Sequence, residues 1–219
     1  MPVKDFMTKR VVYVSPETTV AKATDMMREQ HLRRLPVIEN DQLVGLVTEG
    51  TIAEARPSKA TSLSIYEMNY LLNKTKIRDI MIKDVVTVSK DANLEDAIYM
   101  MMQKKIGVLP VVDHGQMSGI ITDKDVFRAF LEISGYGVEG LRLHLLVEDR
   151  VGVLESVVRS LTSENLNIKR LLVSERDSGK AALDIQIDGR TDVETLRQTL
   201  SDQGFEVEAI HKTETKAIF

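Results

Sequence analysis

The sequence places a threonine and an aspartate three positions apart in the segment Gly119-Ile-Ile-Thr-Asp-Lys-Asp125. Thr122 and Asp125 follow an apolar run at the expected start of a helix, where backbone N–H groups carry partial positive charge and suit a phosphate. The Asp125 carboxylate can accept hydrogen bonds from both hydroxyls of a ribose, and the Thr122 hydroxyl adds a third polar anchor. The two residues therefore predict a nucleotide site, with the alternative that they only cap the helix.

The other residue types offer little catalytic or metal-binding chemistry. The chain contains no cysteine, which excludes thiolate zinc sites, iron–sulfur clusters and cysteine nucleophiles. None of its four histidines has a second histidine three to five positions away, the spacing of a helical metal pair. The sequence also has no P-loop and no Gly-x-Ser-x-Gly elbow. We therefore expect no catalytic residues, no metal site and no enzyme activity.

The composition is typical of a folded protein. Of the 219 residues, 43% are hydrophobic and 28% are charged, which argues against disorder. The net charge of −4 leaves no basic face for phosphates, so we expect no nucleic-acid partner. Apolar stretches such as Val108–Val112 are far shorter than the ~18 residues of a membrane span, and the first residues show no signal-peptide pattern. We expect a cytoplasmic protein with no membrane contact.

An internal repeat is the most informative feature of the chain. Met7–Ser15 aligns with Met81–Ser89, and the constant offset of 74 residues then holds without a gap. Further aligned residues are a Leu-Pro-Val run, a glycine and a threonine: Leu35-Pro36-Val37 with Leu109-Pro110-Val111, Gly45 with Gly119, and Thr48 with Thr122. Two copies of one unit therefore occupy roughly residues 1–56 and 75–131.

Each copy predicts the element order β-α-β-β-α. A short apolar strand, Val11–Val14 or Val85–Val88, leads to a helix with apolar residues at helical spacing. A buried strand, a polar turn, a second strand and a closing helix follow. Because each copy leaves an apolar face, we expect the copies to pack against each other. Between them, Ser64-Ile-Tyr-Glu67 has the capping-box spacing that starts a linker helix.

The doubled unit resembles a pair of CBS domains, a Bateman module, and Gly119–Asp125 is the most specific part of the match. The resemblance implies that the second copy binds an adenosine nucleotide (AMP, ADP or ATP) as a regulatory ligand, with S-adenosylmethionine as an alternative. It also implies an apolar adenine slot at the strand ends. The candidate residues beside Thr122 and Asp125 are Val86, Thr87, Gly107, Val108 and Pro110.

The first copy departs from this pattern. Its equivalent segment is Thr48-Glu-Gly-Thr51, with a hydroxyl where the ribose carboxylate is expected. Thr51 cannot hold both ribose hydroxyls, so we expect this site to be weaker or empty. Arg33 and Arg34 occupy the stretch that in CBS pairs reaches phosphates. These arginines either supply cations to a shared cleft or form a solvated pair.

From Leu141 onward the pattern predicts a different unit. Apolar residues mark four strands and trace the faces of two helices, in the order β-α-β-β-α-β of the ferredoxin-like antiparallel sheet with both helices on one face. The predicted fold class is therefore α/β and α+β. Before this unit, Gly135-Tyr-Gly-Val-Glu-Gly140 formally matches a dinucleotide fingerprint, but a helix precedes it and a strand follows, the reverse of what that motif requires. We interpret it as a flexible interdomain hinge.

The segment Val147–Leu154, with Asn167-Ile168 behind it, resembles the signature of an ACT domain. The resemblance implies that the first strand-to-helix turn binds an amino acid or a related effector. The candidate residues are Asp149, Arg150, Gly152 and Val153. Arg150 either attracts a ligand carboxylate or forms a surface salt bridge. ACT domains that serve only for dimerisation are the alternative.

Two CBS units followed by an ACT unit resemble the acetoin utilization protein family, the B-type accessory proteins of Bacillus-like bacteria. The linker Ser58–Leu72 strengthens this comparison because it lies outside the generic CBS motif. The expected CBS domains are residues 1–56 and 75–133, joined by a linker helix over residues 57–74. A hinge at residues 134–140 and an ACT domain at residues 141–213 follow.

The resemblance implies a regulatory ligand sensor linked to acetoin catabolism. It also implies small-molecule effectors, a regulated protein partner and a homodimer, because CBS and ACT modules each commonly pair with themselves. The alternative function is a dimerisation or assembly module that binds no ligand and serves a metabolic enzyme or regulator. A phosphotransfer enzyme would need more carboxylates than Asp123 and Asp125.

Overall fold

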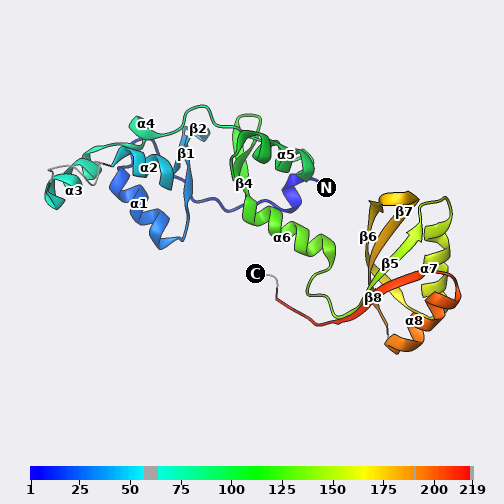
Figure 1. Ribbon diagram of the computed structural model, residues 1–219. Coiled ribbons are helices and arrows are strands. Elements are labelled where there is room, and N and C mark those ends of the chain that lie inside the picture. Colours follow the sequence, from blue (N-terminus) through cyan, green and yellow to red (C-terminus); the bar gives the residue numbers. More distant parts are fainter. Residues whose placement is uncertain (57–63, 190, 218–219) are drawn as a thin grey trace. The chain divides into compact units, whose positions relative to one another are not determined.

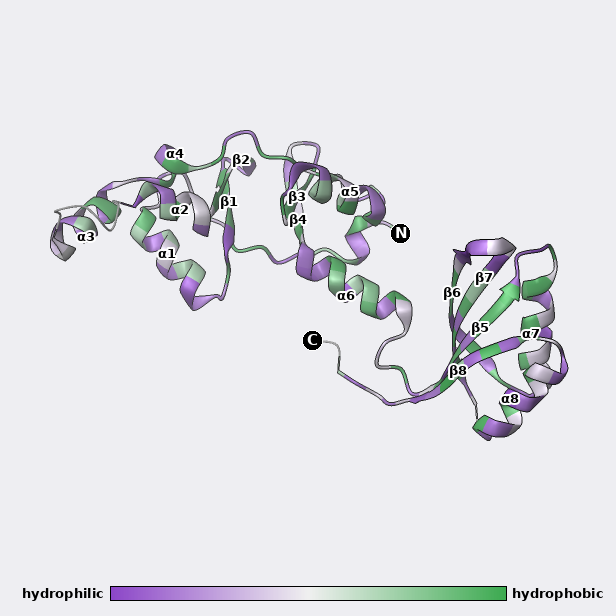
Figure 2. Ribbon diagram, viewed as in Figure 1, coloured by the Kyte–Doolittle hydropathy of each residue, from purple (hydrophilic) through white to green (hydrophobic). Residues whose placement is uncertain are grey.

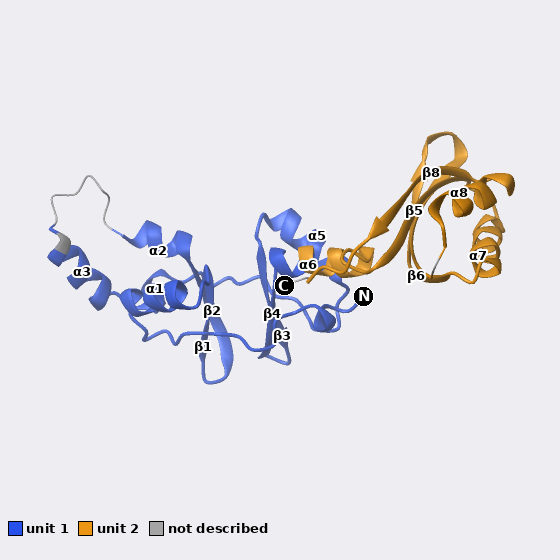
Figure 3. Ribbon diagram, turned by 90° about the horizontal axis from the view of Figure 1, so that it is seen from below, with its two compact units in different colours: residues 1–126 blue, residues 127–219 orange. Residues whose placement is uncertain are grey.

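A computed structural model describes residues 1–56, 64–189 and 191–217 (Figure 1). The chain divides into two compact units, Met1–Val126 and Phe127–Phe219, shown in two colours in Figure 3. The boundary falls inside helix α6 (Asp123–Ser134). The segment 134–140, expected as an interdomain hinge, therefore lies within the second unit.

The first unit contains the first copy of the repeat and the second copy up to the first turn of α6. Its helices before α6 are η1 (Val3–Asp5), α1 (Val20–Glu29), α2 (Glu49–Ala55), α3 (Ile65–Lys74), α4 (Ile77–Ile80) and α5 (Leu94–Lys104). Its strands are β1 (Arg34–Glu39), β2 (Gln42–Thr48), β3 (Val108–Asp113) and β4 (Gln116–Thr122). Each copy thus supplies one hairpin with a helix before it and a helix after it, as the repeat predicts.

The two hairpins join into one four-stranded antiparallel sheet with the strand order β1-β2-β4-β3. The copies meet where Gln42 of β2 pairs with Gln116 of β4. Both hairpins carry a register shift at the same repeat position, between Val37 and Ile38 and between Val111 and Val112. The repeat in the sequence is therefore kept in the backbone register.

The first strand expected in each copy is shorter than the apolar run suggests. Only Val14 and Val88 of the segments 11–14 and 85–88 form a bridge, each parallel, to Val37 and Val111 respectively. The remaining residues of both segments belong to no strand.

The linker helix begins where its capping box predicts. Ser64 N donates to Glu67 Oε2 at 2.7 Å, and Glu67 N donates to Ser64 Oγ at 3.3 Å, so both free N–H groups at the start of α3 find a partner. The rest of the expected linker, residues 57–63, lies outside the described residues.

The segment that leads into each copy packs on the other copy, and we call these segments the leading arms (residues 1–8 and 75–82). In the first arm, Thr8 N donates to Ile120 O at 2.8 Å and Ile120 N donates to Thr8 O at 3.0 Å. At the equivalent place in the second arm, Ile82 and Leu46 exchange two hydrogen bonds of 2.9 Å. The two copies are therefore tied together by reciprocal backbone pairing.

The second unit has the predicted ferredoxin-like order. Its elements after α6 are β5 (Gly140–Glu148), α7 (Val153–Ser163), β6 (Asn167–Arg176), η2 (Asp177–Gly179), β7 (Lys180–Asp188), α8 (Val193–Asp202) and β8 (Glu206–Thr213). The antiparallel sheet has the order β6-β7-β5-β8, and both α7 and α8 cover one of its faces (Figure 1). The fold class predicted from the sequence is confirmed.

Alternation along the strands explains this core. In β5 every second residue is buried, and these residues pack with the apolar stripes of the two helices. In Figure 2 the arrowhead of β5 has the hydrophobic colour. The fully buried residues include Leu143, Leu145, Leu161, Ile185 and Leu200.

The segment 134–140 is held against the sheet of the second unit. Gln186 Nε2, on a side chain with 1% exposure, donates to Val138 O at 3.2 Å. Lys216 N donates to Gly137 O at 3.1 Å, and Arg170 Nε donates to Glu132 O at 3.4 Å. These contacts tie the end of α6 and the glycine-rich segment to β6, β7 and the chain after β8.

None of the helices in the described part of the chain is both long enough and apolar enough to span a membrane.

Candidate functional site

The Thr122–Asp125 segment forms a closed polar turn at the start of α6. Asp125 Oδ2 accepts hydrogen bonds from Thr122 N at 2.8 Å and from Thr122 Oγ1 at 2.7 Å, and Asp125 N donates to Thr122 Oγ1 at 3.4 Å. The Asp125 side chain is 6% exposed. The structure therefore brings the predicted carboxylate and hydroxyl together, and they also cap the helix.

The first copy forms the same turn with a different group. Thr48 N donates to Thr51 Oγ1 at 2.9 Å, and Thr51 N donates to Thr48 Oγ1 at 3.1 Å. Thr51 thus does for α2 what Asp125 does for α6. Helix capping is served equally by the hydroxyl and the carboxylate, so it does not explain why only the second copy carries an acid.

The expected adenine residues lie beside this turn. Val108 pairs with Thr122 across the β3–β4 ladder and is buried, as is Pro110. Val88 N donates to Pro110 O at 3.1 Å, which brings the half-buried Val86 and Thr87 alongside β3. The candidates thus gather around β3: Val108 and Pro110 belong to the strand, Gly107 directly precedes it, and Val86 and Thr87 precede the bridge from Val88 to Val111.

The N–H groups at the start of α6 already donate within the chain, which the sequence did not indicate. Asp123 N donates to Gly107 O at 3.2 Å, and Lys124 N donates to Asp123 Oδ1 at 2.9 Å. Figure 2 shows this first turn in hydrophilic colour. A phosphate here would meet the carboxylates of Asp123 and Asp125 on the first turn, so it needs a cation as its main partner.

Arg34 of the first copy brings a cation to this turn. Its Nη1 donates to Gly107 O at 2.9 Å and lies 4.0 Å from Asp123 Oδ1. A Cβ at Gly107 would lie 2.7 Å from Asp123 Oδ2 and 2.9 Å from Arg34 Nη2. Glycine at position 107 is therefore what lets the guanidinium approach the second copy.

The neighbouring Arg33 behaves differently. Its side chain is 77% exposed and its Nε lies 3.9 Å from Glu49 Oε2, a weak surface ion pair. The sequence offered two alternatives for the arginine pair, cations of a shared cleft or a solvated pair. Arg34 contacts the second copy, whereas Arg33 lies beside Glu49 at the surface.

Gly107 and Asp123 were not recognised from the sequence for these polar roles. The repeat alignment contains a usable signal, because Gly107 stands opposite Arg33 and Asp123 opposite Glu49.

The predicted effector turn of the second unit lies between β5 and α7, as expected. Gly152 is the N-cap residue of α7 with a φ of 87°, and Val153 N donates to Arg150 O at 3.3 Å. Asp149 N donates to Gly179 O at 2.9 Å. The side chains of Asp149 and Arg150 are exposed, and Val153 is half-buried.

Metal binding has no support in the described part of the chain, where no three His, Cys, Asp or Glu side chains gather closely enough to hold an ion.

Comparison with known proteins relates the first unit to one family. The family model described as "CBS domain" matches residues 3–58 and 77–132. The uncharacterized protein MJ1225 of Methanocaldococcus jannaschii is 35% identical over 132 residues, which cover 57% of this chain and 47% of that protein. The CBS domain-containing protein YhcV of Bacillus subtilis is 30% identical over 124 residues, 57% of this chain and 81% of that protein.

An inosine-5'-monophosphate dehydrogenase of Korarchaeum cryptofilum is 37% identical over 125 residues, but these cover only 23% of that enzyme. The chain thus spans about half or less of the length of these two longer relatives, MJ1225 and the dehydrogenase. So partial a match gives no indication of the enzyme's activity in this chain.

Solved structures give the same result. A Vibrio cholerae protein assigned to acetoin utilization (AcuB) has a TM-score of 0.52 and 28% identity, over 60% of this chain and 91% of that chain. CBSX2 in complex with AMP has a TM-score of 0.51 and 34% identity, over 60% of this chain and 97% of that chain. With both repeat copies matched, the chain belongs to the CBS domain family.

Proposed function

We propose that this chain is a regulatory sensor that binds an adenosine nucleotide at its second CBS copy. The observation that carries the proposal is the buried Asp125 carboxylate at the start of α6, where capping alone requires only the hydroxyl that Thr51 supplies in the first copy. The ribose hydroxyls would replace the Thr122 groups on this carboxylate. The AMP complex of CBSX2 supports the ligand class.

The surroundings complete a nucleotide site. The buried apolar residues Val108 and Pro110 of β3 would form the wall of an adenine slot. Arg34 reaches Gly107 from the first copy and offers a guanidinium to a phosphate. AMP, ADP and ATP all fit this chemistry, and S-adenosylmethionine shares the adenosine part.

Calorimetric titration with AMP, ADP, ATP and S-adenosylmethionine tests the proposal. Asp125→Asn keeps the shape of the side chain but removes its charge, so we expect the affinity to fall about tenfold or more. Asp96→Asn, which changes an exposed carboxylate in the first turn of α5, is the matched control and should bind normally. Equal affinity for the Asp125 variant and the wild type would contradict the proposed site.

The alternative is an assembly module that binds no ligand, and a chain that binds none of the four compounds would favour it.

Self-association of the chain has support under either function. Helix α5 exposes Tyr99 (64%) and Met102 (72%) three residues apart, and α6 exposes Phe127 (68%) and Phe130 (65%) with the same spacing. We propose that a second copy of the chain covers these apolar faces. A monomer mass in light scattering well above micromolar concentration would exclude this homodimer.

We further propose that the turn Asp149–Val153 of the second unit is the effector loop of an ACT-like domain. Its support is the ferredoxin-like topology and the exposed Arg150 beside the positive φ of Gly152. An amino-acid carboxylate would bind the Arg150 guanidinium at the start of α7. Chemical-shift titration with a panel of amino acids should move these residues in the wild type and not in Arg150→Gln.

We place the sensor in the cytoplasm, in the control of acetoin catabolism, where it would act on a protein partner. The likeness to the Vibrio cholerae AcuB structure supports this role. Deletion of the gene should slow growth on acetoin and leave growth on glucose unchanged. Equal growth of both strains on acetoin would contradict the role.

A further inference from the structure

The two CBS copies differ most in the groove between the helices that flank each hairpin. In the first copy, α1 and α2 enclose a cavity of about 650 Å³. Its lining consists mainly of residues from these helices and the loop after α1: Thr24, Met27, Arg28, His31, Leu32, Arg33, Glu49, Ile52, Ala53 and Arg56, with Lys124 from the second copy. A cavity of this size lies within the ~300–1,000 Å³ range of small-molecule sites.

The groove has an apolar floor and a positive rim. Met27 and Ile52 form the floor and are 4% and 3% exposed. Arg28, Arg56 and Lys124 all line the groove with exposed side chains. Lys124 belongs to the first turn of α6, so the second copy contributes to the rim.

The positive charge of the rim is only partly compensated. Glu49 is the one acid in the lining, and it lies 3.9 Å from Arg33. Arg28 pairs with Asp25 at 2.8 Å on an exposed turn of α1. Among the described residues, neither Arg56 nor Lys124 has an ion-pair partner within 4.0 Å. The groove therefore has a surplus of cations toward solvent.

The repeat provides an internal comparison. At the offset of 74 residues, Arg28 corresponds to Met102, Arg56 to Phe130 and Thr24 to Ile98. The second copy is therefore apolar at these three positions, two of which carry an arginine in the first copy. Because both copies build the same helices, these arginines are not needed to form them.

We propose that the α1–α2 groove of the first copy binds the phosphate or diphosphate group of a small molecule. Guanidinium groups bind phosphate oxygens with two parallel hydrogen bonds, and Lys124 adds a point charge. The apolar floor would take a nonpolar part of the same ligand. This site is separate from the proposed adenosine site, because none of its lining residues is Thr122, Asp125 or an adenine candidate.

Calorimetric titration of the full chain with inorganic pyrophosphate tests the proposal. We expect one pyrophosphate per chain, with an affinity that falls about tenfold or more in Arg56→Gln and in Lys124→Gln. Lys22→Gln removes an exposed charge from α1 outside the lining and should bind normally. Thermal melts of each variant establish that it is folded.

The Asp125→Asn variant separates this site from the adenosine site. We expect it to lose AMP affinity and to keep pyrophosphate affinity. Pyrophosphate binding that is insensitive to Arg56→Gln and Lys124→Gln would overturn the proposal. So would the absence of pyrophosphate binding at millimolar concentration, whatever the result with AMP.

Discussion

Arg34 Nη1 donates a hydrogen bond of 2.9 Å to Gly107 O, which joins the start of a strand in one CBS copy to the start of the equivalent strand in the other. The Arg34 side chain, 29% exposed, thereby lies beside the second copy's Thr122–Asp125 turn, and its Nη1 is 4.0 Å from Asp123 Oδ1. Because the carbonyl and the carboxylate hold it in place, little side-chain entropy remains to be lost when a phosphate binds.

We expect Arg34→Gln to weaken AMP binding about tenfold and to leave adenosine binding unchanged. The reason is that the guanidinium contacts the phosphate and not the ribose or the base. Titration of wild type and variant with both compounds measures the two effects separately. Arg10→Gln, which changes an exposed arginine outside both proposed sites, is the control and should bind both normally. An equal loss for adenosine and AMP would show that Arg34 acts on the fold of the site and not on the phosphate.

Gly119→Ala should destabilise the chain by about 1–3 kcal/mol through overpacking. A Cβ at this position would lie 2.8 Å from Met7 Sδ and 2.9 Å from the backbone oxygen of Thr8, so the leading arm must shift. Denaturant unfolding measures the loss. Gly50→Ala is the control, because its new Cβ would meet only Thr48 Oγ1 at 3.4 Å and alanine favours the helix. Equal stability of both variants would mean that the arm is not packed at Gly119.

The sequence predicts much of this fold because each element of the CBS unit occurs twice, in the same register, in the repeat. The hairpins, the capping turns at Thr48 and Thr122, and the β-α-β-β-α-β order of the second unit all follow from local patterns. These patterns depend only on the spacing of residue types along the chain, which can be read directly from the sequence.

The crossing of the leading arms could not be predicted in this way. Val3 and Ile77 are both fully buried. An apolar residue gains the same stabilisation from burial in either copy, so its type does not indicate which copy covers it. The destination of the Arg34 guanidinium is also set by tertiary geometry, since a long side chain can reach several carbonyls. The local sequence pattern therefore identifies these residues as buried or charged, but it does not predict which residues of the other copy they contact.

The glycine-rich segment shows a second limit. Three glycines in six residues suggest flexibility, but Gly135, Gly137 and Gly140 have φ values of 74°, 80° and 145°, which other residues rarely adopt. These turns bring Val138 O to Gln186 Nε2. Glycine content alone does not distinguish a mobile joint from a sharply turned and packed one.

Thr51→Asp should create a second adenosine site in the first copy. The substitution places a carboxylate at the position that corresponds to Asp125, and an acid in the first helical turn also suits the helix dipole. We expect the calorimetric stoichiometry for AMP to rise from one to two per chain. Thr51→Asn has a similar size without the charge and should leave the stoichiometry at one. A single site in both variants would show that the first copy lacks more than the carboxylate.

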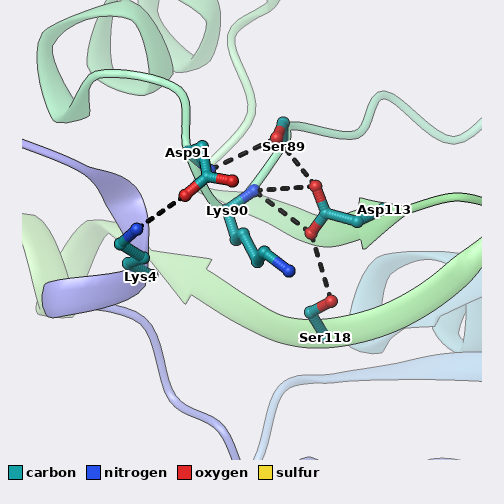
Figure 4. Close-up of polar contacts among 6 residues, drawn as sticks. All are labelled: Lys4, Ser89, Lys90, Asp91, Asp113 and Ser118. Atoms are coloured by element: carbon teal, nitrogen blue, oxygen red, sulfur yellow. Dashed lines mark hydrogen bonds and ion pairs between the residues drawn. The ribbon is translucent and has the colours of Figure 1, made fainter.

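The second copy also carries a polar cluster that the first copy lacks (Figure 4). Asp113 Oδ1 accepts a hydrogen bond from Ser89 Oγ at 2.7 Å, Asp113 Oδ2 accepts one from Ser118 Oγ at 3.1 Å, and the Lys90 N–H donates to both oxygens at 3.3–3.4 Å. The bond from Ser89 is the largest cause that lowers the pKa of the Asp113 carboxyl below its ordinary value of 3.8. Partial desolvation opposes this shift, and Lys90 and Ser118 add to it.

We expect Asp113→Asn to alter the acid stability of the chain. A carboxyl whose pKa is lower in the folded chain than in the unfolded one stabilises the fold above the ordinary value of 3.8 and loses this effect as pH falls through the folded pKa. The wild type should therefore melt at a higher temperature than Asp113→Asn at pH 6, and the difference should narrow below pH 3.8.

Glu39→Gln, at the equivalent position of the first hairpin, is the matched control and should show no such convergence with the wild type. A melting difference that stays constant from pH 6 to pH 3 would mean that the charge of Asp113 does not stabilise the cluster.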